Sequence, residues 1–78
     1  SGLELAHLSE THTCEESRTI MESIAHEIQT IDLAIAEAKD AWTSDPNSPG
    51  LARLLSSYYR AKAALQGRAS EVAARVSC

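Results

Sequence analysis

One eight-residue break divides this sequence, and it reads Thr43-Ser44-Asp45-Pro46-Asn47-Ser48-Pro49-Gly50. Pro46 disfavours helical backbone at the residue before it, and Asp and Asn side chains readily bond the backbone of a turn. Ser48 is a favourable helix N-cap, and Pro49 suits the first helical position because an N–H there would have no partner. The break therefore predicts a turn over residues 43–48 and a helix that begins at Pro49.

The segment before the break has the spacing of an amphipathic helix. Thr13 and Glu16 have the spacing of a capping box, and Glu15 and Glu16 place negative charge where the helix dipole favours it. The apolar positions that follow alternate steps of three and four residues: Met21, Ile24, Ile28, Ile31, Ile35, Ala38 and Trp42. A flanking row widens this stripe, at Ile20, Ala34 and Ala41. The pattern predicts a helix over residues 14–42.

The segment after the break is also amphipathic. Its apolar positions are Leu51, Leu54, Leu55, Tyr58, Ala61, Leu65, Ala69, Val72 and Val76. Four of them recur every seven residues, while the intermediate row drifts and contains small alanines. Gly67 is a weak point, because glycine costs about 1 kcal/mol against alanine inside a helix. We predict a helix over residues 49–76, with a kink or an end at Gly67 as the open question.

Two amphipathic helices of similar length, joined by a short connection, favour an all-α, coiled-coil-like antiparallel hairpin over residues 14–78. Charge agrees with this pairing: residues 14–42 carry seven acids and two bases, net −5, and residues 49–77 carry five bases and one acid, net +4. Residues 1–13 have no clear period. We expect them to form a head that is partly ordered or contains a short helix.

Size and composition narrow the class of protein. A chain of 78 residues holds one small domain and buries only about 60% of its unfolded surface. Its 44% hydrophobic residues are too many for a disordered chain of net charge −4. No apolar run approaches the ~18 residues of a membrane-spanning helix, so we expect no membrane insertion. Two cysteines do not indicate an oxidising compartment, and the expected location is cytoplasmic.

The sequence offers no enzyme signature. No serine, histidine or carboxylate lies in a nucleophile elbow or a phosphate loop, and a two-helix chain lacks the concave pocket that acid–base catalysis needs. The soft metal ligands are His7, His12, Cys14, His26 and Cys78. Their spacing is not that of a zinc site. We therefore predict no catalytic residues, no cofactor and no metal.

A loose basic row on the second helix raises the question of nucleic acid. It consists of Arg53, Arg60, Arg68 and Arg75, and such a row can contact phosphates. The acidic first helix gives a simpler account, because its carboxylates can pair with these arginines. An acidic chain is also a poor partner for nucleic acid. We expect no nucleic-acid partner.

Cys14 and Cys78 form a candidate disulfide. In an antiparallel hairpin, the start of the first helix and the end of the second lie at the same end of the molecule. A bridge that closes so long a loop stabilises by about 4 kcal/mol in the chain-entropy model, if its geometry is allowed. Two free thiols, one of them on a frayed terminus, are the alternative.

Two helices alone leave one side of each apolar stripe without cover, which favours recruitment of another chain. We predict that the contact residues are Met21, Ile24, Ile28, Ile31, Ile35, Trp42, Tyr58 and Tyr59. Adjacent helical residues differ by about 100° in direction, so one tyrosine of the pair faces the other helix and the second faces outward. Covering of the hairpin tip by the two rings is the alternative for the tyrosines.

The turn also carries a resemblance. Pro46-Asn47-Ser48-Pro49 followed by Leu51-Ala52 resembles the Pro-x-x-Pro, Leu-Ala turn of bacterial type III secretion needle subunits, which are small helical hairpins. In the needle family the Leu-Ala pair lies one residue further along, and the second helix is longer and ends in an apolar tail. The overall plan is more similar to the small co-chaperone of the same export system.

The resemblance implies a non-catalytic partner protein. The co-chaperone pairs with a tetratricopeptide-repeat (helical-repeat) chaperone and holds the needle subunit in the cytoplasm, so it implies a hetero-oligomer formed through one exposed helix face. A homo-oligomeric structural subunit, needle-like or a coiled-coil oligomerisation domain, is the alternative function.

Overall fold

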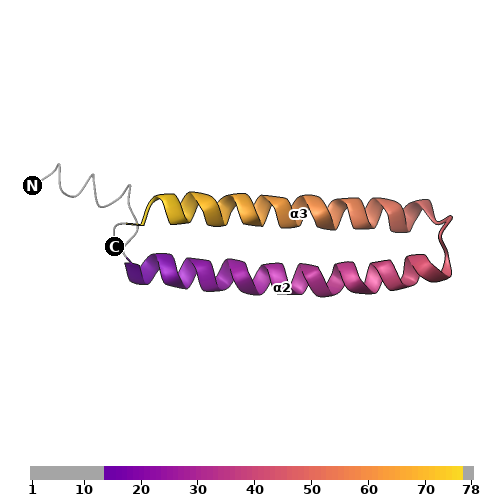
Figure 1. Cartoon of the computed structure of the whole chain (residues 1–78), viewed down its shortest axis with the longest axis horizontal. Coiled ribbons are helices and arrows are strands. Elements are labelled where there is room, and N and C mark those ends of the chain that lie inside the picture. Colours follow the sequence, from indigo (N-terminus) through magenta and orange to yellow (C-terminus); the bar gives the residue numbers. More distant parts are fainter. Residues whose placement is uncertain (1–13, 77–78) are drawn as a thin grey trace, which may run out of the picture.

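The structure, a computed structural model, describes residues 14–76. It contains two long helices, α2 (Cys14–Ser44) and α3 (Pro49–Ala74), which run antiparallel beside each other (Figure 1). The predicted all-α helical hairpin is confirmed. The predicted head, residues 1–13, and the predicted disulfide partner Cys78 lie outside the described residues.

The turn has the chemistry that the break in the sequence predicts. The Leu51 N–H donates to Ser48 Oγ at 3.2 Å, and Pro49 occupies the first turn of α3. Before the turn, the Asp45 N–H donates to the carbonyl oxygens of Ala41 and Trp42, and the Ser48 N–H donates to the Asp45 carbonyl. Three residues between α2 and the cap thus reverse the chain, and both backbone groups of Asp45 are hydrogen-bonded.

The ends of the helices differ from the predicted ends by two residues each. α2 continues past Trp42 to Ser44, because the restriction from Pro46 falls on Asp45 and leaves Thr43 and Ser44 free to stay helical. α3 ends at Ala74 instead of residue 76. There the N–H groups of Arg75 and Val76 donate to carbonyls three residues back, which is the tighter turn common at helix ends.

The contact between the helices follows a heptad pattern. The buried and half-buried positions of α2 include Ser17, Met21, Ile24, Ile28, Ile31, Ile35, Ala38 and Trp42, and those of α3 are Leu51, Ala52, Leu55, Tyr58, Lys62, Leu65, Ala69 and Val72. The steps of three and four mark a coiled-coil contact. The core centres near the turn, where Ile35, Ala38 and Leu55 are buried together. Ile31, Trp42 and Tyr58 pack against this cluster.

The second helix is continuous through Gly67. α3 includes this residue without an end, and a Cβ built there would meet no atom within 4 Å. Packing along the rest of α3 therefore maintains the helix across its weakest residue. Within the described part of the chain, neither helix combines the length and apolar character needed to cross a bilayer.

Candidate partner-binding face

The predicted contact residues divide into three groups by exposure. Ile24 and Ile35 are buried between α2 and α3, with Ile24 only 3% exposed. Five are half-buried along the same contact: Met21, Ile28, Ile31, Trp42 and Tyr58. Tyr59 is 46% exposed, so the expectation that one tyrosine faces the other helix and one faces outward is confirmed. The half-buried residues keep part of their surface exposed to solvent, and Ile31 among them also lines a groove beside the contact.

One side of the helix contact is closed by polar interactions between α2 and α3. Lys62 Nζ lies 2.7 Å from Asp32 Oδ1. Nearer the hairpin tip, Lys39 lies two turns beyond Asp32 on α2, and Tyr59 lies one turn before Lys62 on α3. Lys39 Nζ is 5.6 Å from the centre of the Tyr59 ring, a cation–π distance. We call this the closed side. Its ion pair is partly exposed and adds at most about 1 kcal/mol.

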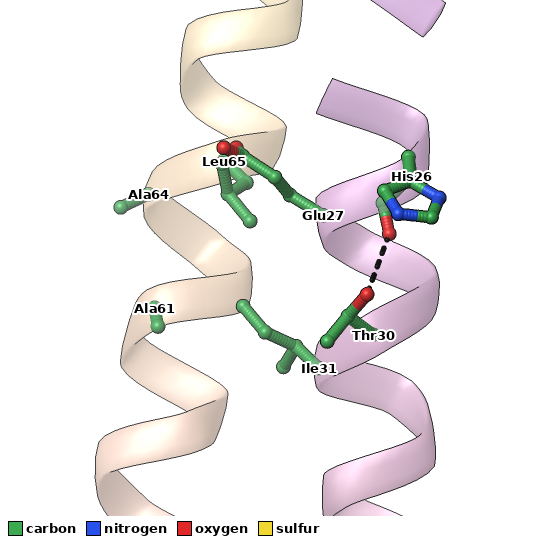
Figure 2. A pocket seen from close by; sticks show the side chains of 7 residues that line it. All are labelled: His26, Glu27, Thr30, Ile31, Ala61, Ala64 and Leu65. Atoms are coloured by element: carbon green, nitrogen blue, oxygen red, sulfur yellow. Dashed lines mark hydrogen bonds between the residues drawn. The ribbon is translucent and has the colours of Figure 1, made fainter. Parts of the chain in front are cut away.

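The opposite side holds an apolar groove of about 500 Å³ that opens to solvent. Its lining residues are His26, Glu27, Thr30, Ile31, Ala61, Ala64 and Leu65. Figure 2 shows Ile31 and Glu27 reaching from α2 toward α3, while Ala61 and Ala64 present single methyl groups. The Thr30 hydroxyl donates to the His26 carbonyl, so this groove residue is bonded within its own helix (Figure 2).

The groove belongs to a longer surface, because residues seven apart lie on the same side of a heptad contact. From Glu27 on α2 the row continues to Ala34 and Ala41, and from Ala61 on α3 it continues back to Leu54. Leu54 is 40% exposed. We call this surface the open face: the groove residues together with Ala34, Ala41 and Leu54. Its small side chains leave room for a helix backbone to approach closely.

Two of the apolar positions expected on α3 lie outside the helix contact. Leu54 and Ala61 are exposed on the open face, and Lys62 takes a position in the contact instead. Ranking positions by hydrophobicity hides this, since lysine can bury its methylene stem and keep its ammonium group in water. The spacing of Tyr58, Lys62 and Leu65 could have indicated this position, because it keeps the alternating steps of four and three residues.

Two further apolar side chains are exposed. Leu33 is 68% exposed on α2, one heptad after the groove residue His26, and so borders the open face. Tyr59 is on the closed side under Lys39. Single exposed apolar residues are normal on protein surfaces, so neither defines a site.

The candidate disulfide is described at one end. Cys14 begins α2 and is disulfide-bonded. Cys78, the other cysteine of the sequence, lies outside the described residues, so the pairing of Cys14 with Cys78 stays a prediction. Among residues 14–76, no group of three His, Cys, Asp or Glu side chains is placed to hold a metal ion.

Comparison with known proteins adds no relative: no family model, no curated protein and no solved structure matches this chain. The candidate function therefore depends on the geometry of the hairpin itself.

Proposed function

We propose that this chain is a non-catalytic protein-interaction module that binds helices along its open face. The observation that supports it is the difference between the two sides of the helix contact. On the closed side, Asp32 and Lys62 bridge α2 and α3. On the open side lies an apolar groove, lined by two alanines together with Ile31 and Leu65. A helix laid in such a groove covers apolar surface with ridges that fit between the two helices.

The resemblance to secretion co-chaperones gives this proposal a more specific form. In that form the chain is an assembly factor of a type III secretion needle, and it binds a helical-repeat chaperone or the needle subunit in the cytoplasm. Two features support this form of the proposal: the hairpin architecture, and a half-buried apolar row on α2 that includes Met21 and Ile28.

A self-assembling subunit is the second candidate. The observation that favours it is the opposite charge of the two helices: α2 carries seven acids and two bases, net −5, and residues 49–74 of α3 carry four bases and one acid, net +3. Each helix of one copy is therefore a suitable neighbour for the other helix of a second copy.

A matched pair of substitutions tests the module proposal. Ala61→Glu places a charge on the open face, and Ala63→Glu places the same charge on an exposed position of the same helix outside that face. We expect immobilised wild-type protein and immobilised Ala63→Glu to capture the same native binding partner, which can be a further copy of this chain. Immobilised Ala61→Glu should capture at least tenfold less of that partner. Equal capture by all three proteins would overturn the proposal. Circular dichroism confirms that both variants keep their helices.

A further inference from the structure

From the charge and packing of the open face, we propose that its occupant is a second copy of this chain, docked open face to open face in a four-helix bundle with both hairpin tips at the same end. This proposal rests on the module function above and names the partner. The two-fold axis then runs parallel to the helices.

The opposite charges of the two helices favour this direction of the axis. A two-fold axis parallel to the helices places α2 of one copy against α3 of the other, so that a helix of net −5 meets one of net +3 along both new contacts. An axis perpendicular to the helices within the interface would instead place α2 against α2 and α3 against α3. Like-charged neighbours oppose association, so the parallel axis is favoured.

The positions of individual charges along the helices also suit this dimer. Rotation about an axis parallel to the helices keeps every residue at its own level along the bundle. Glu27 lines the groove at the level of Ala64 and Leu65, and Arg68 follows one helical turn after Ala64 in the same row as Ala61. Glu27 of each copy therefore lies about one helical turn from the level of Arg68 of the other, an offset that the long arginine side chain can span. An acid at the rim of an apolar interface is matched by a base.

The area and shape of the open face are those of a stable interface. Two adjacent helices of about 10 Å diameter and about 40 Å length present a face of about 800 Å², which is the area that each partner of a standard stable complex buries. The alanines at 34, 41, 61 and 64 lie across this face. Alanine positions let helix axes approach to the short end of the usual 8–10 Å range. The half-buried Ile31 and Leu65 then lose their remaining exposure to water.

Sedimentation equilibrium of the oxidised full chain tests the partner. We expect twice the mass of the 8.4 kDa monomer, a dimer unchanged by Ala63→Glu, and a dissociation constant raised at least tenfold by Ala61→Glu. A second pair, Ala41→Glu on the open face and Ala36→Glu outside it, repeats the comparison on α2. A monomer at all concentrations overturns the second-copy proposal, and so does a dimer that Ala61→Glu and Ala41→Glu leave intact.

The direction of the axis has its own test. A spin label on p-acetylphenylalanine at position 47, in the exposed tip, leaves both cysteines untouched. We expect electron–electron distances below about 30 Å for tips at one end, against about 40 Å or more for tips at opposite ends of helices this long. The longer distance overturns the proposed bundle. A monomer whose capture of another protein is still lost with Ala61→Glu overturns the second-copy partner and leaves the module function standing.

Discussion

At the scale of single residues, the least expected side chain is Ser17. It occupies a heptad position in the contact between the helices, is 3% exposed, and its hydroxyl has no hydrogen-bond partner among residues 14–76. A buried hydroxyl without a partner costs about 1–3 kcal/mol of desolvation. Replacing it with alanine removes the polar atom and leaves the backbone unchanged, because alanine is also the better helix former.

We therefore predict that Ser17→Ala raises the free energy of unfolding by about 1 kcal/mol. Chemical denaturation followed by circular dichroism at 222 nm measures it. Ser23→Ala is the matched control, since Ser23 is an exposed serine of the same helix. It should show only the gain in helix propensity, a few tenths of a kcal/mol. Equal gains from the two substitutions would mean that the buried hydroxyl carries no penalty.

Ser48 is a residue whose role the sequence does predict. Its hydroxyl accepts from the Leu51 N–H, and its backbone is extended, as an N-cap requires. We expect Ser48→Ala to lower the free energy of unfolding by about 1 kcal/mol. Ser48→Asp should retain most of the stability, because a carboxylate can cap the same N–H. Loss of equal size in both variants would show that the cap is not what stabilises the start of α3.

At the scale of the helix, Gly67 offers a direct test of continuity. It lies within α3, and a Cβ there has free space. We predict that Gly67→Ala stabilises the chain by about 0.5–1 kcal/mol, because alanine loses less backbone entropy on becoming helical. Thermal unfolding measures the change. Gly50→Ala, at the start of α3, is the comparison, and an unchanged melting temperature for Gly67→Ala would indicate that α3 is broken there in solution.

The helices also show how far sequence reasoning reaches. The break at Pro46 and Pro49 fixed the turn and the start of α3, because proline and cap chemistry act locally. The ends at Ser44 and Ala74 were missed by two residues each. The end of a helix depends on which residue the following proline restricts and on how the last turn tightens. The spacing of hydrophobic residues carries no information about either.

The open face was harder to predict than the fold. Spacing identified the stripe that joins α2 to α3, but the same residues could not reveal which of its two sides stays uncovered. That depends on the closed side, where Lys62 meets Asp32 across the helices. The pairing of residues thirty apart requires the register of the hairpin. Hence Ala61 was assigned to the contact and Lys62 was not.

At the scale of the whole molecule, the two ends of the hairpin are held differently. The Pro46–Pro49 turn and the Ile35–Leu55 core hold one end. At the other end, α2 begins with a disulfide-bonded cysteine, and Val72 is buried near the end of α3. Because so much chain separates Cys14 from Cys78, a bridge between them removes much of the entropy of the unfolded chain.

We predict that reduction of the disulfide lowers the free energy of unfolding by up to about 4 kcal/mol. This loss is a large part of the total stability of a small domain. Denaturant titrations of wild-type protein with and without reductant measure it. Cys14→Ser is the control: its free energy of unfolding should equal that of the reduced wild type and should not change when reductant is added. On a non-reducing gel the wild-type chain should migrate as a monomer, because the expected bridge lies within one chain. Coincident unfolding curves for oxidised and reduced protein, or a disulfide-linked dimer on the gel, would contradict the Cys14–Cys78 bridge.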